Sequence, residues 1–238
     1  MLEPPTRSAS PIRSVFVTGT DTSVGKTLVS TALLHALARH YPRVVGMKPV
    51  AAGTAEVNGV QANDDVLALR AASSCSVPHA LDNPVLLADA VSPHIAAARA
   101  GVRIDIAHIA SCHRQLMQLV DAVVVEGAGG FMVPLSSSEN GADLAQALGL
   151  PVVLVVGLRL GCLNHALLTV EAIRARGLTL AGWVANHIDP TMQAQADNLD
   201  FLQHHLSAPL LAKIAWQPDA DPKNLTMKLP ATWLPASA

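Results

Sequence analysis

The sequence predicts a single α/β domain in which a mostly parallel β-sheet is flanked by helices. Short apolar, β-branched runs alternate with helical stretches along most of the chain, and each run is apolar throughout. Parallel strands that are buried on both faces have this continuous pattern, and helical crossovers connect them. The predicted strands are Val15–Thr18, Val44–Met47, Ala122–Val125, Val152–Val156, Leu180–Ala185 and Leu210–Ile214.

Length and composition are those of one domain. The 238 residues, half of them apolar, can bury one substantial core, and neither an internal repeat nor a linker divides them. We expect residues 1–13 to form a flexible N-terminal tail, because the first eleven residues carry three prolines and no apolar signal core. Residues 14–238 would form the domain.

Charge and cysteine content narrow the class of partner. The formal net charge is −2, so the sequence predicts no basic face for nucleic acid and no polybasic patch for a membrane. Cys75, Cys112 and Cys162 are odd in number and far apart, which suggests neither a disulfide framework nor a zinc site. The longest apolar run, Pro151–Leu158, is too short to span a bilayer. We expect a cytoplasmic protein that acts on a small molecule.

A glycine-bounded loop is the most specific motif in the chain. Gly19-Thr20-Asp21-Thr22-Ser23-Val24-Gly25-Lys26-Thr27 follows the first strand and opens a helical segment, Leu28–Arg39. The backbone N–H groups of such a loop hold phosphate oxygens, the lysine reaches the terminal phosphates, and the threonine hydroxyl can bind Mg²⁺. Five residues, instead of the usual four, separate the two glycines, so we interpret the loop as a longer P-loop variant and the domain as P-loop NTPase-like. An ordinary Gly/Thr turn is the alternative.

Polar residues also follow the other predicted strands. Ligands in parallel α/β sheets bind outside the carboxyl ends of the strands, so these residues are candidates for a shared site. Any one of them alone is also explained as part of a polar surface loop. The segments are Lys48-Pro49-Val50-Ala51-Ala52-Gly53, Glu126-Gly127-Ala128-Gly129-Gly130, Arg159-Leu160-Gly161-Cys162-Leu163-Asn164 and Asn186-His187.

Two carboxylates are candidate metal ligands beside Thr27. Glu126 ends a predicted strand at the point where a P-loop protein places its second metal-directed carboxylate, although a solvated glutamate is the alternative. In Asn63-Asp64-Asp65, which precedes the helical run Val66–Leu69, one aspartate can cap the helix while the other reaches the metal. These residues predict a Mg²⁺ site at the phosphate loop.

Two further segments suggest substrate contacts. Lys48 precedes a proline, so the chain is extended there and the ammonium projects from the sheet end, unless it is a salt-bridged surface lysine. The turn Gly161–Asn164 opens a helical segment whose free N–H groups could hold a second anion, such as a carboxylate. We expect Cys162 to be a small packing residue, and we assign no role to His94.

Five motifs, in order along the chain, closely resemble those of the dethiobiotin synthetase family. The resemblance runs from about Ser14 to Trp216, and the motifs together are far more specific than the loop alone. They are Val17-Thr18-Gly19-Thr20-Asp21-Thr22 with Gly25-Lys26-Thr27, Lys48-Pro49-Val50-Ala51, Val125-Glu126-Gly127-Ala128-Gly129-Gly130, Gly161-Cys162-Leu163-Asn164-His165-Ala166, and Gly182-Trp183-Val184-Ala185-Asn186.

The resemblance implies a cyclo-ligase of biotin biosynthesis that uses ATP and Mg²⁺. Members of the family join 7,8-diaminononanoate and CO₂ into the cyclic urea of dethiobiotin, through a carbamate and a carbamic-phosphoric anhydride, and release ADP and phosphate. The family also implies a homodimer in which the helix start at Leu160-Gly161-Cys162 of the neighbouring subunit holds the substrate carboxylate.

The resemblance assigns roles to individual residues. Lys26, Lys48 and Thr22 would be catalytic, and the two lysines would neutralise charge on the transferring phosphoryl group and the carbamate. Thr27, Asp65 and Glu126 would hold Mg²⁺. Nucleotide-binding residues would be Ser23, Val24, Gly25, Lys26, Thr27, Asp65, Glu126, Gly127, Ala128, Gly129, Asn186, His187, Ala215, Trp216 and Gln217. Substrate-binding residues would be Lys48, Ala52, Leu160, Gly161, Cys162 and Asn164.

Two departures from the family pattern and two rival functions remain. Ala52 stands where the family often has a serine, and Ser23 where a glutamate is common, which affects positioning and leaves the metal ligands and lysines in place.

A nucleotide switch of the partitioning-ATPase kind would carry an additional lysine early in the loop, where this chain has Asp21. Another ATP-dependent ligase on the same fold would need a glutaminase partner or a larger substrate region.

Overall fold

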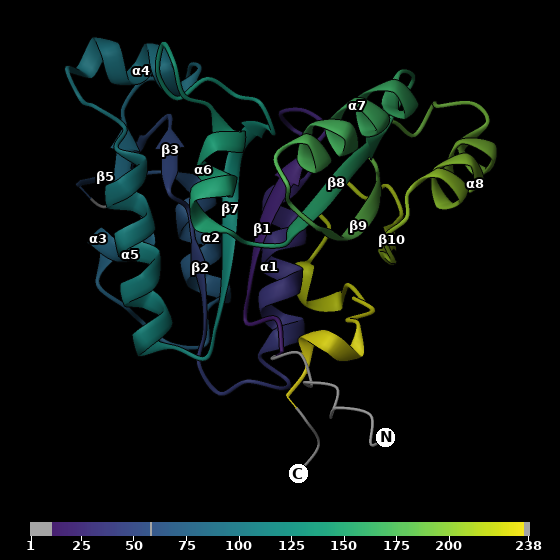
Figure 1. Ribbon diagram of the computed structural model, residues 1–238, viewed down its shortest axis with the longest axis horizontal. Helices are drawn as coiled ribbons and strands as arrows, with labels where there is room; N and C mark the ends of the chain where they lie inside the picture. The colour runs from purple at the N-terminus through teal and green to yellow at the C-terminus, as the bar shows by residue number, and fades with distance from the viewer. Residues whose placement is uncertain (1–10, 58, 236–238) are drawn as a thin grey trace, which may run out of the picture.

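A six-stranded parallel sheet forms the centre of the computed structural model, which describes residues 11–57 and 59–235 (Figure 1). The strand order is β10-β9-β8-β1-β7-β2. All six strands predicted from apolar runs are present, and the α/β fold class is confirmed. The strands are β1 (Ser14–Gly19), β2 (Val44–Met47), β7 (Ala122–Gly130), β8 (Val152–Leu158), β9 (Leu180–His187) and β10 (Leu210–Ile214).

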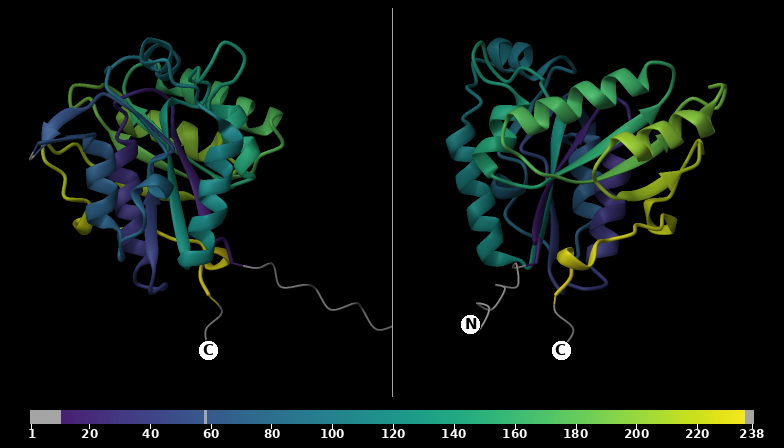
Figure 2. Two further views of the ribbon diagram at one scale, coloured as in Figure 1. Left: turned by 90° about the vertical axis from the view of Figure 1, so that its left-hand side faces the viewer. Right: turned by 45° about the vertical axis from the view of Figure 1, so that its right-hand side comes forward.

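Helices cover both faces of the sheet (Figure 2). On one face the apolar side chains of α1, α2 and the C-terminal segment pack on β1, β7 and β8, whereas α4, α5, α6, α7 and α8 pack on the other. The helices are α1 (Lys26–Leu37), α2 (Asp64–Ala72), α3 (His79–Asp82), α4 (Pro93–Ala100), α5 (Ile106–Leu119), α6 (Gly141–Leu148), α7 (Cys162–Ala175) and α8 (Gln195–His205).

Two small sheets lie between β2 and α4. The parallel pair is β3 (Val50–Ala52) with β6 (Val85–Leu87), and the antiparallel hairpin is β4 (Ala55–Val57) with β5 (Val60–Ala62). The sequence runs did not predict these three-residue strands. The first pair carries the chain beyond Lys48 along the edge of the site.

The two ends of the described chain pack on the same face of the domain. Ile12 N donates a hydrogen bond to Thr232 O at 3.0 Å, and Arg13 Nε donates to Asp121 O at 2.7 Å. Trp233 is fully buried, and Tyr41 Oη donates to its carbonyl at 2.8 Å. Of the predicted flexible tail, residues 1–10 lie outside the described residues, whereas the last part is held by these contacts.

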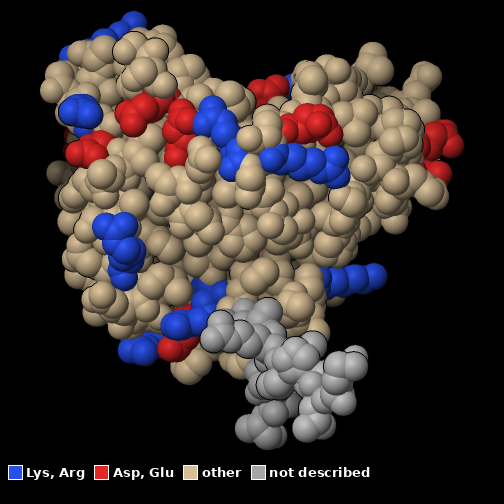
Figure 3. Space-filling model, viewed as in Figure 1, with Lys and Arg blue, Asp and Glu red and all other residues tan. Residues whose placement is uncertain are grey.

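Charged side chains of both signs lie together on the face shown in Figure 3, with acidic groups beside basic ones along its upper part. This arrangement accords with the small net charge of −2. Among the described residues, no helix is long and apolar enough to cross a membrane.

A buried histidine makes the stability of the domain sensitive to acid. His113 of α5 lies 2.9 Å from Ser14 Oγ through its Nε2, and burial, with the neighbouring Arg114 charge, lowers its pKa to about 4. In the unfolded chain the imidazole of His113 takes up a proton near pH 6.5, whereas in the folded chain it stays neutral down to about pH 4. The contribution of His113 to the free energy of unfolding is therefore complete above pH 6.5 and is lost as the pH falls toward 4. We expect the free energy of unfolding to fall by about 2 kcal/mol between pH 7.5 and pH 5 from this residue.

Urea unfolding of wild type and His113→Asn at the two pH values tests this expectation. The variant should lose most of the pH dependence, and the exposed control His204→Asn should keep it. An equal pH dependence in His113→Asn and wild type would contradict the assignment.

Candidate functional site

The loop between β1 and α1 has the conformation of a phosphate cradle. Ser23 and Gly25 both have positive φ, 58° and 90°, which turns the chain so that α1 begins at Lys26 without a side-chain cap. An added Cβ at Gly25 would lie 2.3 Å from Asn186 Nδ2, so only glycine fits there. The first N–H groups of α1 therefore stay free, as the binding of an anion requires.

Lys26 lies inside this loop. Its Nζ donates to Asp21 O at 3.0 Å, so that the loop curls around the ammonium. Burial and, next, the nearby Lys48 charge lower the pKa of Lys26 to about 8, against the opposing effect of the surrounding carboxylates. A polyphosphate beside this lysine would favour its charged form.

The four predicted residues Thr27, Lys48, Asp65 and Glu126 meet in one cluster. Thr27 Oγ1 lies 2.7 Å from Asp65 Oδ1 and 3.0 Å from Glu126 Oε1. Lys48 Nζ donates to Asp65 Oδ2 at 2.8 Å and to Glu126 Oε1 at 2.5 Å. The structure therefore brings the three predicted metal ligands and a predicted catalytic lysine together.

The cluster is buried and strongly coupled. The Glu126 side chain is 0% exposed and that of Lys48 is 4% exposed. Burial opposes the charged form of Lys48, but Glu126 and Asp65 outweigh it and raise its pKa. Burial would raise the pKa of Asp65, yet the Lys48 charge, with hydrogen bonds from Lys48 and Thr27, holds it low. The lysine is thus an ammonium and the aspartate a carboxylate at neutral pH.

The same oxygens suit a hard divalent cation. Two carboxylates and a hydroxyl provide the oxygen donors that Mg²⁺ prefers. In the described part of the chain, Glu126 Oε2 is one of three buried side-chain atoms without a hydrogen-bond partner. A buried carboxylate oxygen without a donor has unused capacity for a cation, so the residues fit a magnesium site.

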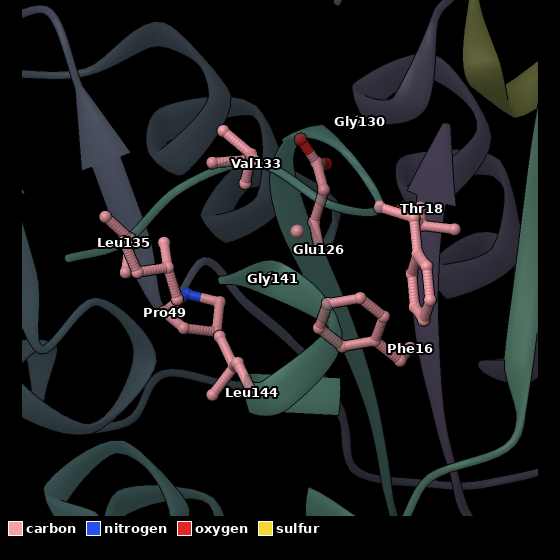
Figure 4. Close-up of a pocket in the computed structure, with 13 residues that line it drawn as sticks. Phe16, Thr18, Pro49, Glu126, Gly130, Val133, Leu135, Gly141 and Leu144 are labelled. Atoms are coloured by element: carbon pink, nitrogen blue, oxygen red, sulfur yellow. The ribbon is translucent and has the colours of Figure 1, made fainter. Parts of the chain in front are cut away.

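A small internal cavity lies directly behind the cluster. Its volume is about 10 Å³, room for one water molecule, and most of its wall is apolar. Figure 4 shows the Glu126 carboxylate at the upper end of this pocket and Phe16 and Leu144 at the lower end. Apolar packing thus surrounds the stem of Glu126 and fixes the carboxylate. Glu126 lies within β7 and does not end it, because the strand continues to Gly130 beyond the predicted end at Val125.

An open cleft of about 650 Å³ lies in front of the cluster. It is large enough for polyphosphate and a second small molecule. The predicted residues that line it are Thr22, Ser23, Gly25, Lys26, Thr27, Lys48, Ala52, Asp65, Ala128 and Gly129. Glu126 and Gly127 line the small cavity behind it instead.

Other predicted nucleotide residues lie behind the loop or beyond it. Asn186 is buried, and its Nδ2 donates to Val24 O at 2.9 Å, so it supports the back of the loop. His187 Nδ1 lies 2.8 Å from Gln195 Oε1. The apolar run had placed both residues after the strand, but the structure has them within β9. Ala215–Gln217 follow β10 and are exposed.

The predicted carboxylate-binding turn does not line this cleft within one chain. Leu160 is 94% exposed, Gly161 has a positive φ of 95° and precedes the first turn of α7, and Asn164 is exposed. Cys162 is buried, which raises its thiol pKa and agrees with the predicted packing role.

Sequence reasoning missed residues that support Lys48 or complete the cleft. Asn83 Nδ2 donates to Lys48 O at 2.7 Å, and Lys48 N donates to Asp82 O at 2.8 Å. Ser92 and Pro93, at the start of α4, line the cleft. Asn63 caps α2 by accepting from Val66 N at 3.2 Å, so neither aspartate is the cap that we predicted. A Ser-Pro pair is typical of the start of a helix, so this pair could have predicted that α4 begins here.

A family comparison fits this geometry. The model of the AAA domain family (AAA_26) matches residues 13–224, which is most of the chain. The chain belongs to the AAA domain family. Membership in this family, together with the loop at Lys26, supports a nucleotide-dependent activity for this AAA domain.

Two solved structures are similar to this chain. A ParA family ATPase from Chlorobium tepidum TLS matches this AAA domain with a TM-score of 0.54 and 14% sequence identity, over 87% of this chain and 86% of that chain. The signal recognition particle receptor FtsY from Elizabethkingia anophelis, in complex with GDP, matches with a TM-score of 0.47 and 14% identity, over 95% of this chain and 63% of that chain. The likeness to the ParA family ATPase shows a shared α/β fold with a mostly parallel central sheet flanked by helices.

Proposed function

We propose that this protein is a dethiobiotin synthetase, a cyclo-ligase that uses ATP and Mg²⁺ to close 7,8-diaminononanoate and CO₂ into a cyclic urea. The observation that carries the proposal is the cluster of Thr27, Lys48, Asp65 and Glu126 beside Lys26, at the wall of a cleft with room for a second substrate. The five sequence motifs support it, and so does the AAA domain family, which contains dethiobiotin synthetase.

The loop and the cluster would bind the triphosphate. The backbone amides of Ser23–Thr27 would hold phosphate oxygens, and the Lys26 ammonium would move from Asp21 O to the terminal phosphates. Thr27, Asp65 and Glu126 would hold Mg²⁺, which neutralises phosphate charge and orients the γ-phosphoryl group when bound. Asn186, His187 and the backbone of Ala215–Gln217 would contact the adenine.

The chemistry needs electrostatic stabilisation and positioning more than a covalent group. One amine adds to CO₂ and loses a proton to give a carbamate, and a carbamate oxygen then attacks the γ-phosphorus as ADP leaves. The second amine attacks the carbamoyl carbon, phosphate departs with the C–O electron pair, and the amine releases a proton. Lys48 would stabilise negative charge on the carbamate and the transferring phosphoryl group, and the cleft would hold the two amines beside one carbon.

A second copy of the chain would complete the substrate site. The start of α7 would bind the substrate carboxylate in the cleft of its partner, through the free N–H groups near Gly161. Leu168 and Met132 line one pocket and are 61% and 49% exposed, and Leu160 is 94% exposed. These exposed apolar side chains support a homodimer contact. We also propose a cytoplasmic location, because the three cysteines lie far apart in the sequence and suggest no disulfide framework.

Coupled product analysis tests the proposed function. ADP formation should require both the diamine and bicarbonate, and mass spectrometry should detect one dethiobiotin for each ADP. ATP turnover that is indifferent to the diamine would overturn the proposal. Slow basal hydrolysis with nucleotide-dependent oligomerisation would instead support the partitioning-ATPase alternative.

A further inference from the structure

Two strands on one side of β1, β8 and β9, anchor the phosphate loop at Thr20 and Val24. Thr20 N donates to Val155 O of β8 at 3.0 Å, and Asn186 of β9 holds Val24 O. An added Cβ at Gly157 of β8 would lie 2.8 Å from a Val24 methyl, so Val24 packs directly on that strand. The side of the loop that lines the cleft carries the groups that face a ligand. The shape of the loop therefore depends on its contacts with β8 and β9.

One charged contact joins the same strand to the first half of the loop. The Arg159 guanidinium, directly after β8, donates to Asp21 Oδ2. Asp21 Oδ1 accepts from Thr22 N at 2.7 Å, and Asp21 O accepts from Lys26 Nζ at 3.0 Å. Arg159 therefore fixes a residue that itself holds a loop amide and the loop lysine.

We propose that Arg159 is a positioning residue for nucleotide binding, which acts through Asp21 to hold the phosphate loop in its binding conformation. Ser23 has φ 58°, a left-handed conformation that costs of the order of 1 kcal/mol or more in a non-glycine residue and persists only where its surroundings hold it. Anchoring Asp21, two positions earlier, restricts the loop to this shape before the ligand arrives. Such preorganisation increases affinity without a new contact to the ligand.

Because the Arg159–Asp21 pair is exposed, an effect on nucleotide affinity can be distinguished from an effect on the stability of the whole domain. The side chains of Arg159 and Asp21 are 42% and 46% exposed, and ion pairs of this kind contribute little to global stability. A loss of the pair should therefore appear in nucleotide affinity while the melting temperature stays nearly constant.

Calorimetric titration of the full chain with ATP and Mg²⁺, without diamine, tests the proposal. We expect Arg159→Ala to weaken ATP binding about tenfold, a change of about 1.4 kcal/mol, with a melting temperature within about 2 °C of wild type. Arg159→Lys keeps the charge and should recover part of the affinity. Arg174→Ala removes a comparable exposed ion pair with Glu171 on α7 and should bind ATP as wild type does.

A double-mutant cycle with Asp21→Asn gives the decisive result. Because both residues would act through one contact, each single variant and the double variant should lose affinity to a similar extent. Additive losses would mean that Arg159 acts on the ligand independently of Asp21 and would overturn the proposal, as would unchanged affinity in Arg159→Ala. The titration omits the diamine, so its outcome does not depend on the ring-closing reaction.

Discussion

Glu126→Gln is expected to lower Mg²⁺-dependent turnover at least about 100-fold. Glutamine keeps the shape of the side chain but replaces a buried carboxylate by a neutral amide. The Glu126 side chain is 0% exposed and its Oε2 has no hydrogen-bond partner within the described chain. A neutral oxygen is a weaker ligand for a hard dication, so the Mg²⁺ concentration for half-maximal activity should also rise.

Steady-state rates measured over a range of Mg²⁺ concentrations check this expectation. Because the change also weakens a buried ion pair with Lys48, circular dichroism and a melting curve must show that the variant is folded at the assay temperature. Glu171→Gln, on the exposed face of α7, is the matched control and should behave as wild type. A normal Mg²⁺ dependence in Glu126→Gln would reject the metal role.

Sequence patterns predicted the sheet well because burial on both faces leaves a clear signal. All seven residues of β8 are buried, and its run reads as apolar without interruption. The order of the strands could not be predicted, since apolar periodicity carries no information about pairing. The hairpin of β4 and β5 is largely exposed, so its three-residue strands lack the apolar pattern that identifies a buried strand.

The candidate site was predictable where chemistry restricts the residue type. Lys26 and Thr27 were predicted from the phosphate loop, and Glu126 from the end of an apolar run, although β7 continues past it to Gly130. Lys48 was predicted to project from the sheet end, and the structure adds that it is buried between two carboxylates. The Arg159–Asp21 pair spans 138 positions along the chain, and only the adjacency of β1 and β8 brings it together.

Lys48→Met should lower kcat by about 100- to 1,000-fold, the loss expected when one preorganised group that stabilises transition-state charge is removed. Methionine keeps the length and apolar stem of the side chain but has no ammonium. Within the described chain the hydrogen bonds of Lys48 Nζ go to Asp65, Glu126 and Gly127 O, which all lie outside the phosphate loop, so the Kd for ATP should change far less than kcat. Rapid-quench measurement of phosphoryl transfer, with ATP binding by calorimetry, separates the two quantities.

The same substitution should also reduce stability, because it leaves the buried Glu126 carboxylate without its ammonium partner. Breaking a buried ion pair by removing one partner costs about 3–5 kcal/mol in the free energy of unfolding. Lys213→Met, at an exposed position of β10, removes the same charge from the chain without touching the cluster and should alter neither quantity. Removing a group that stabilises the transition state must slow the chemical step. Near-normal kcat in folded Lys48→Met, or a loss confined to ATP affinity, would therefore show that Lys48 serves only to compensate charge in the cluster.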